Sequence, residues 1–276
     1  MDNFSFIPGT TPLLVSMPHC GTDLPPELRP RLTEAALALP DTDWHVDRLY
    51  DFAAELGAGV LRATHSRYVI DLNRPPDDRP LYPGASNTGL VPTTLFDEGP
   101  VYRPNAAPGP VEVAERLARY WQPYHDRLAA ELKRLRDHFG VALLFDAHSI
   151  RSTVPRFFAG RLPDLNLGTA DGASAAAGLA AVLLETASQT DSYSTVLNGR
   201  FKGGYITRTY GRPAENIHAV QLELAQSTYM DEAPPFAFRD DRAAAIRPIL
   251  RRLLEAMLAF GAGAQGEVAR PARTVA

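Results

Sequence analysis

The stretch Val141-Ala-Leu-Leu-Phe-Asp-Ala-His148 decides the fold class of this 276-residue chain. Its five successive apolar residues predict a short buried strand, as α/β folds contain. Asp146 and His148 stand where this strand is expected to run out, and ligands of open α/β sheets bind at the carboxyl ends of the strands. The stretch therefore predicts a buried sheet and a functional site at one edge of it.

Apolar runs of strand length alternate with helical stretches along the rest of the chain, which indicates an α/β fold. Two stretches, 73–109 and 150–172, lack the pattern of a helix or a strand and are predicted to be long loops. Loops of that length are usually functional. Because no linker or repeat is visible, we expect one domain over residues 1–276, with a frayed tail after residue 261. Strands are predicted near 12–18, 59–64, 67–72, 141–146, 193–198 and 219–225, and helices near 43–57, 110–138, 173–189 and 240–260.

Composition narrows the class of protein. The chain is 45% hydrophobic and 22% charged, which is ample for a core, and its formal net charge of −4 favours neither nucleic acid nor a membrane surface as a partner. The single cysteine fits a reducing compartment. We find no signal-peptide pattern and no apolar run near the ~20 residues that span a bilayer. These features predict a cytoplasmic protein.

Polar residues stand at the ends of other predicted strands as well. His19 follows the run 12–18, and Glu223 lies in Val220-Gln-Leu-Glu-Leu224. The run 67–72 leads into Asn73 and Arg74 and contains Asp71. Histidines, carboxylates and an arginine at four strand ends indicate one assembled site, of the kind that binds a metal beside an anion.

Two histidines in this setting are candidate metal ligands, although a lone histidine more often has a structural role. A catalytic zinc takes three ligands from His, Asp or Glu and leaves a fourth position open. His19 and His148 would supply two of them, and either Asp43 or Asp47 the third, because these aspartates share a helix face. The remaining histidines lack a strand-end setting and are interpreted as structural: His45, His65, His125, His138 and His218.

Glu223 is flanked by leucines, and a carboxylate in a buried strand is costly unless it is paired or functional. In a metallohydrolase such a glutamate acts as the general base. The alternative is a buried structural pair with an arginine. Arginine binds both oxygens of a carboxylate, and the candidates for substrate binding beside the strand ends are Arg67, Arg74, Arg151, Arg200 and Arg208.

The segment 198–211 is rich in glycine and cations, and it is either an anion-binding loop or a basic hairpin turning at Gly203-Gly204. Other chemistries fit the sequence less well. We find no Gly-x-Ser-x-Gly elbow, P-loop or dinucleotide fingerprint. Cys20 as a nucleophile needs a nearby base, and its neighbour His19 would point to the opposite side of a strand.

Six ordered motifs resemble those of the N-formylglutamate amidohydrolase family. The resemblance covers about residues 10–260. The motifs are Pro18-His-Cys-Gly21, Asp41-Thr-Asp-Trp-His-Val-Asp-Arg-Leu-Tyr50, Ser66-Arg-Tyr-Val-Ile-Asp-Leu-Asn-Arg-Pro75, Asp146-Ala-His-Ser149, Asn198-Gly-Arg-Phe-Lys-Gly-Gly-Tyr-Ile-Thr-Arg208 and Gln221-Leu-Glu-Leu-Ala-Gln226.

The resemblance implies hydrolysis of N-formyl-L-glutamate to formate and L-glutamate in histidine degradation. It also implies a fold similar to zinc-dependent exopeptidases, a three-layer α/β/α sandwich over a mixed, mostly parallel sheet. By order in the chain, His19 and His148 correspond to the zinc histidines of those enzymes and Glu223 to their general base. Asn73 and Arg74 resemble the pair that holds the substrate carboxylate.

The sequence departs from the exopeptidase pattern at the third ligand. Those enzymes place a glutamate three residues after the first histidine, where this chain has Thr22. Asp43 or Asp47 must then replace it, with Zn²⁺ or another divalent metal bound. Two other hypotheses are a binding protein for an anionic metabolite and a deacylase or carboxypeptidase for a larger N-acyl amino acid. A buried Glu223 favours an enzyme, because anion binding gains nothing from it.

Overall fold

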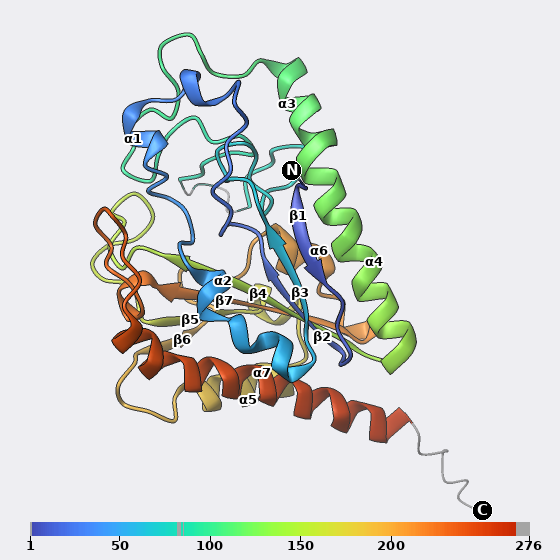
Figure 1. Cartoon of the computed structure of the whole chain (residues 1–276). Helices are drawn as coiled ribbons and strands as arrows, with labels where there is room; N and C mark the ends of the chain where they lie inside the picture. Colours follow the sequence, from blue (N-terminus) through green and yellow to red (C-terminus); the bar gives the residue numbers. More distant parts are fainter. Residues whose placement is uncertain (1, 82–83, 85, 269–276) are drawn as a thin grey trace, which may run out of the picture.

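The computed structural model describes residues 2–81, 84 and 86–268, and places a seven-stranded sheet at the centre of the molecule (Figure 1). The strand order is β1-β3-β2-β4-β7-β5-β6. The strands are β1 (Phe4–Ile7), β2 (Leu13–Met17), β3 (Gly59–Ala63), β4 (Ala142–Ile150), β5 (Leu165–Gly168), β6 (Thr195–Leu197) and β7 (Ile217–Ala225).

The sheet is mixed and mostly parallel. β3, β2, β4 and β7 run parallel to one another in its centre, and β6 is parallel to β5. β1 and β5 are antiparallel to β3 and β7 respectively. The central parallel strands bring their carboxyl ends to one edge, as the sequence predicted.

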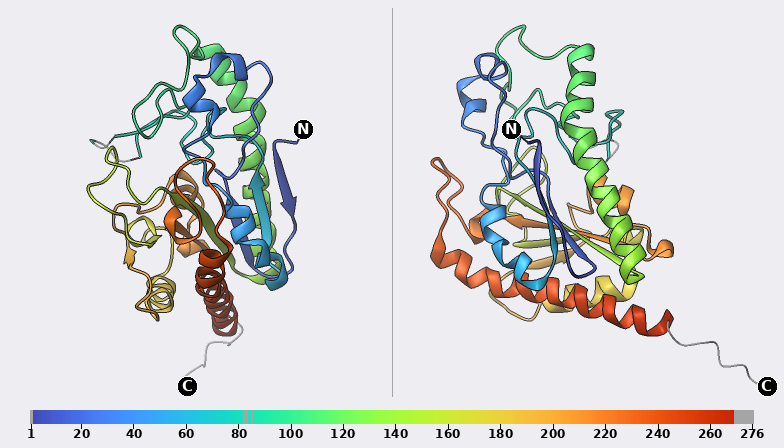
Figure 2. Two further views of the ribbon diagram at one scale, coloured as in Figure 1. Left: turned by 60° about the vertical axis from the view of Figure 1, so that its left-hand side comes forward. Right: turned by 45° about the vertical axis from the view of Figure 1, so that its right-hand side comes forward.

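Helices lie on both faces of this sheet, so the predicted three-layer sandwich is confirmed (Figure 2). The shorter helical segments include a π-helical turn, η3 (Leu117–Trp121), between α3 and α4. The α-helices are α1 (Glu34–Leu37), α2 (Val46–Leu49), α3 (Pro110–Arg116), α4 (Gln122–Phe139), α5 (Ala177–Ala187), α6 (Tyr205–Tyr210) and α7 (Asp240–Val268).

Two hydrophobic cores form because successive side chains of a strand point to opposite faces. On one face Leu143 and Phe145 pack with residues of α5 and α7, such as Leu253. On the other face Leu144 packs with residues of α4, such as Leu128. Every residue of β4 is buried, which explains why apolar and polar residues alternate so little along this strand.

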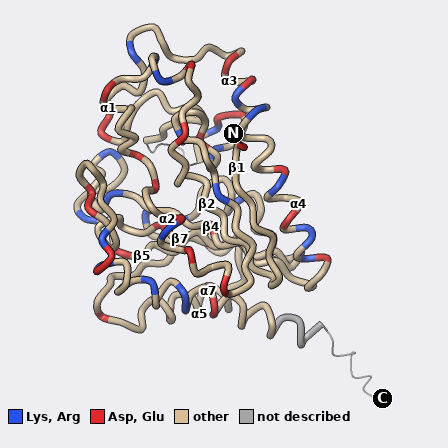
Figure 3. Tube along the Cα trace, in the orientation of Figure 1, with Lys and Arg blue, Asp and Glu red and all other residues tan. Residues whose placement is uncertain are grey.

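The surface carries charges of both signs. Figure 3 shows basic and acidic residues alternating along α3 and α4. Examples are the pairs Arg116–Glu112 and Lys133–Asp137, each four residues apart on a helix. Among the described helices, none is both long enough and apolar enough to cross a lipid bilayer.

The predicted strand at 67–72 is wrong, because this segment folds as turns. The Ser66 hydroxyl accepts a hydrogen bond from the backbone N–H of Tyr68 (3.2 Å), and the Asp71 carboxylate accepts one from the N–H of Asn73 (2.8 Å). Such side-chain bonds compete with a strand ladder for the same backbone groups. The predicted helix at 43–57 is also broken, since His45 has a positive φ of 61° before α2 and a 3₁₀ segment (Asp51–Leu56) follows.

Other boundaries differ from prediction. Strands β1 and β5 and helices α1 and α6 were not predicted, and β5 lies inside the expected loop 150–172. α6 follows Gly204, so 198–211 is not a hairpin. β4 continues to Ile150, which places His148 within the strand. α7 extends to Val268 rather than ending near residue 260, and the last residues of the expected tail, 269–276, lie outside the described residues.

Candidate active site

A narrow pocket opens at the carboxyl ends of β2, β4 and β7. Its volume accessible to water is about 80 Å³. His19 follows β2, His148 lies in β4 and Glu223 in β7, and all three line the pocket. Because β4 and β7 are in register with His148 opposite Glu223, the sheet itself sets these two side chains side by side. Asp43 joins them from the turn before α2.

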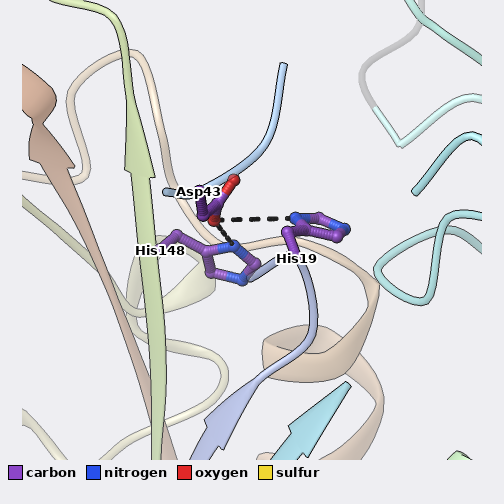
Figure 4. Close-up of side chains that lie close together, drawn as sticks. All are labelled: His19, Asp43 and His148. Carbon is purple, nitrogen blue, oxygen red and sulfur yellow. Dashed lines mark hydrogen bonds and ion pairs between the residues drawn. The ribbon is translucent and has the colours of Figure 1, made fainter. Parts of the chain in front are cut away.

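His19, Asp43 and His148 converge on one point, as Figure 4 shows. The Asp43 Oδ2 atom lies 3.0 Å from His148 Nδ1 and 3.8 Å from His19 Nδ1. One ligand atom from each residue lies within 4.8 Å of the others, and all three residues are buried. Two imidazole nitrogens and a carboxylate oxygen are a donor set that a catalytic zinc takes in proteins, so these residues fit such an ion.

The other nitrogen of each imidazole faces a second carboxylate. His19 Nε2 lies 2.7 Å from Asp71 Oδ1, and His148 Nε2 lies 3.1 Å from Asp146 Oδ2. Metal-binding histidines are usually held in this way, because a carboxylate on the far nitrogen fixes the tautomer and the ring orientation. The Nδ1 atom of His148 is thereby left facing Asp43, and the Nδ1 atom of His19 lies between Asp43 Oδ2 at 3.8 Å and Arg67 Nη2 at 2.8 Å. This arrangement is a second, independent feature that fits a metal site.

Asp43 is itself held by the neighbouring strand end. Its Oδ2 accepts a hydrogen bond from the backbone N–H of Ser149 (3.1 Å). The Tyr229 hydroxyl lies 2.6 Å from Ser149 Oγ and 2.8 Å from the carbonyl oxygen of Trp44. Gln226 Nε2 donates to the carbonyl oxygen of Thr42 (2.9 Å). The chain after β7 therefore fixes the turn that carries Asp43.

Buried charges shift the pKa values of the two histidines in opposite directions. Burial, followed by the nearby Arg67 guanidinium, lowers the pKa of His19 below its usual value. Burial also acts to lower the pKa of His148, but the carboxylates of Asp146 and Asp43 outweigh it and raise that pKa well above its usual value. A positive charge on His148 is therefore favoured by the two carboxylates that flank its ring.

Arg67 is buried against the same group. Its Nη2 atom donates to Asp71 Oδ2 (3.1 Å) and lies 2.8 Å from His19 Nδ1. Its Nη1 atom donates to the carbonyl oxygen of Asp41 (3.1 Å), and its guanidinium lies 5.1 Å from the ring centre of Phe96. Arg67 thus lies at the side of the pocket, within reach of a ligand that occupies it.

Glu223 faces the pocket while its neighbours Leu222 and Leu224 pack into the core on the α5–α7 face. Gln221 Nε2 donates to its Oε2 atom at 3.2 Å. Burial raises the pKa of Glu223 to about 8, since water is excluded from its carboxylate. A carboxyl group with a pKa near neutrality beside a polar cavity is suited to move protons.

Asn73 and Arg74 line the pocket from the turn that replaces the predicted strand. Asn73 Oδ1 accepts a hydrogen bond from the N–H of Ile206 (2.8 Å), and Asn73 Nδ2 lies 3.0 Å from His148 Nε2. A Cβ atom on Gly204 would lie 2.3 Å from Asn73 Nδ2, so glycine is needed there for the close approach of α6. Arg74 donates to the carbonyl oxygen of Asn73 (3.1 Å) and to Thr88 Oγ1 (3.3 Å).

The remaining predicted substrate-binding arginines divide into two groups. Arg200 lines the pocket, and its Nε donates to the carbonyl oxygen of Phe157 at 2.5 Å. Arg151 and Arg208 are not among the lining residues. Arg151 Nη2 lies 3.9 Å from Asp41 Oδ1, and Arg208 Nε donates to the carbonyl oxygen of Gly203 (3.0 Å).

The geometry favours Asp43 over Asp47 as the third metal ligand. Asp47 forms an ion pair with Arg62 at 2.5 Å, and its side chain is 36% exposed. It therefore points away from the two histidines. The five histidines interpreted as structural do not line the pocket. His125, for example, is buried between the carbonyl oxygen of Leu72 (2.9 Å) and the Tyr210 hydroxyl (3.0 Å).

Cys20 does not line the pocket either. Its Sγ atom lies 3.5 Å from the carbonyl oxygen of Met17, and burial raises the pKa of the thiol well above its usual value. A thiol that resists ionisation is a poor nucleophile. The structure thus gives no support to thiol chemistry at this position.

Asp71 and Asp146, which lie beside the two imidazoles, were seen in the sequence but were not among its predicted site residues. Their spacing could have indicated a role at the site, since each lies two residues from another polar residue of its motif, Asn73 or His148. The supporting residues Ser149, Gln226 and Tyr229 carried no such signal, because their role depends on contacts between segments far apart in the chain.

Comparisons with known proteins give the family to which this chain is similar. The family described as N-formylglutamate amidohydrolase matches residues 11–230. The N-formylglutamate deformylase of Pseudomonas aeruginosa is 60% identical over 257 residues, covering 93% of this chain and 96% of that protein. That of Pseudomonas putida is 56% identical over 258 residues, covering 94% and 96%.

Two solved structures share the fold. The N-formylglutamate amidohydrolase from Ralstonia eutropha JMP134 superposes with a TM-score of 0.80 at 26% identity, covering 95% of this chain and 97% of that one. A protein of Agrobacterium tumefaciens superposes with a TM-score of 0.72 at 18% identity, covering 94% and 96%. The likeness in sequence and fold extends over nearly the whole chain, and the chain belongs to the N-formylglutamate amidohydrolase family.

Proposed function

We propose that this protein hydrolyses N-formyl-L-glutamate to formate and L-glutamate with the help of a divalent metal, zinc being the first candidate. The observation that carries the proposal is the buried group of His19, Asp43 and His148 facing a pocket that also contains Glu223. Membership of the family supports the substrate. The reaction would serve histidine degradation in the cytoplasm.

The metal site would be made by Nδ1 of each histidine and a carboxylate oxygen of Asp43. A divalent ion held there would polarise the formyl oxygen and make a water molecule more acidic. Asp71 and Asp146 would keep the two imidazoles in the tautomer that offers Nδ1. Ser149 would keep Asp43 in place through its backbone N–H.

Glu223 would act as the general base. It is ionised when a cation is bound beside it, because the opposite charge offsets the cost of burial. The carboxylate takes a proton from the water that attacks the formyl carbon, so that a C–O bond forms. It then passes that proton to the amide nitrogen as the C–N bond breaks, which releases formate and the amino group of glutamate.

Arginines would bind the two carboxylates of the substrate. Arg74 and Arg67 each have a spare donor, because the buried Nε atom of each finds no hydrogen-bond acceptor among the described residues. Arg67 and Arg200 line the same pocket and add positive charge. A formyl group is small, so most of the binding energy must come from these carboxylates. The partner we propose is accordingly a small anionic N-acyl amino acid.

Formate release tests the proposal. The purified protein should release formate from N-formyl-L-glutamate, lose that activity on removal of metal by a chelator, and regain it with one equivalent of Zn²⁺. His148→Ala should bind no metal and remain inactive, whereas His138→Ala, on an outer turn of α4, should behave as the wild type. Full activity of the chelated protein would contradict a metal-dependent mechanism.

A further inference from the structure

The outer part of the pocket is built from three segments that are far apart in the sequence. Asn87 and Phe96 come from the first long loop, Phe157 from the second, and Arg200 with Phe201 from the segment before α6. The metal-binding group lies at the inner end, where the formyl group must react. The outer wall therefore faces the amino-acid part of the substrate.

One guanidinium joins the first two segments. Arg156 Nε donates to Ser86 Oγ (2.9 Å), and Nη2 donates to the carbonyl oxygen of Asn87 (3.1 Å). Nη1 donates to Thr94 Oγ1 (2.9 Å) and to the carbonyl oxygen of Leu95 (2.6 Å). Arg156 thus makes four hydrogen bonds to a stretch of ten residues. Only the planar fork of an arginine offers donors in so many fixed directions.

The next residue, Phe157, continues the connection to the third segment. Its ring meets that of Phe96 edge to face, with centroids 5.0 Å apart. Its carbonyl oxygen accepts the hydrogen bond from Arg200 Nε, and the Arg200 guanidinium lies 6.0 Å from the Phe157 ring centre. The position of Arg200 in the pocket is therefore tied to that of the loop around Arg156.

We propose that Arg156 is a positioning residue that sets the selectivity of the pocket for the amino-acid part of the substrate. Arg156 does not itself line the pocket, so it acts through Asn87, Phe96 and Phe157. The inference rests on the proposed function, because it assumes that the substrate reacts at the inner end. It explains why two long loops of irregular structure can form a well-defined wall: they share the bonds of one side chain.

The test compares Arg156→Ala with the wild type, on N-formyl-L-glutamate as substrate and N-formyl-L-alanine as a competing ligand without the side-chain carboxylate. We expect KM for N-formyl-L-glutamate to rise by about tenfold or more while kcat changes by less than about threefold, which is a loss of binding shared by the ground state and the transition state. The inhibition constant of N-formyl-L-alanine should change much less, and bound metal not at all. Arg156→Lys, with the charge but not the fork, should give an intermediate KM.

Arg161→Ala is the matched control. Arg161 lies on the same loop, but its guanidinium bonds to Asp164 and Ser227 away from the pocket, so its loss should leave KM unchanged. An unchanged KM in Arg156→Ala would overturn the inference, as would an equal loss of affinity for both ligands, which would indicate general loosening. Failure of the wild type to release formate would instead contradict the proposed function.

Discussion

Replacing Asp71 by asparagine tests the metal site without touching a proposed ligand. The Asp71 carboxylate lies 2.7 Å from His19 Nε2, and its second oxygen accepts a hydrogen bond from Arg67 at 3.1 Å. Its pKa is held well below the usual range: burial opposes this, but the electrostatic interactions with His19 and Arg67 prevail. Asp71→Asn keeps the size of the side chain and an oxygen for the N–H of Asn73, and removes the charge together with the oxygen that accepts the hydrogen bond from Arg67.

The expected effect follows from the distances. Loss of the carboxylate makes His19 a weaker base and leaves its tautomer less well fixed, and changes of this kind weaken metal binding by roughly 10- to 100-fold, or about 1.4 to 2.7 kcal/mol. Zinc affinity would be measured by competition with a chromophoric chelator, for the wild type, Asp71→Asn and Asp146→Asn. Because Asp146 faces His148 at the longer distance of 3.1 Å, its variant should lose no more affinity than Asp71→Asn.

Asp137→Asn, on the outer surface of α4, serves as the control for charge removal alone, since its partners Lys133 and Arg136 are surface residues. The assignment of Asp71 as the partner of a metal-binding histidine would be refuted if Asp71→Asn and Asp137→Asn bind zinc with affinities that agree within about twofold. A loss of affinity with unchanged thermal stability of the metal-free protein would support it.

Three further predictions concern the surroundings of the site. Arg74→Lys keeps the charge but loses the fork, and kcat/KM for N-formyl-L-glutamate should fall by about 100-fold, or ~2.7 kcal/mol, whereas near-full activity would show that geometry is not its contribution. Gly204→Ala places a Cβ against the amide of Asn73, so lower stability and activity are expected in thermal unfolding and formate assays. Burial lowers the pKa of His125 to about 4, so the unfolded chain binds its proton first as pH falls. Stability should therefore drop by about 2 kcal/mol between pH 7.5 and 5 from this residue alone, and His125→Gln should lessen that drop in urea unfolding.

The sequence predicted the architecture where burial dominates. Strands such as 141–146 and helices such as 110–138 are set by apolar patterning, and both were found near their predicted positions. The segment 67–72 is also largely apolar but folds as turns, because Ser66 and Asp71 bond to the backbone of their own neighbours. Local hydrogen bonds from side chain to backbone depend on geometry, and the pattern of apolar residues does not predict them.

The site was predictable where chemistry and strand position coincide. His19, His148 and Glu223 were predicted in this way, and the fold places Asp43 rather than Asp47 in one buried group with the two histidines. Asp71 contacts His19 although the strand predicted at 67–72 does not form. The place of its segment at the site was therefore predicted for a partly wrong reason. The wall held by Arg156 was beyond prediction, because its four bonds join loops about 60 to 70 residues apart.

The central claim is that Glu223 moves the proton beside a metal held by His19, Asp43 and His148. Glu223→Gln preserves the size of the side chain and still meets Gln221, but its amide cannot take up a proton. The decisive measurement is kcat for formate release by this variant, with its zinc content determined on the same sample. The account predicts one bound zinc and a kcat lowered by ~10²- to 10⁴-fold. Wild-type turnover with zinc bound would contradict it.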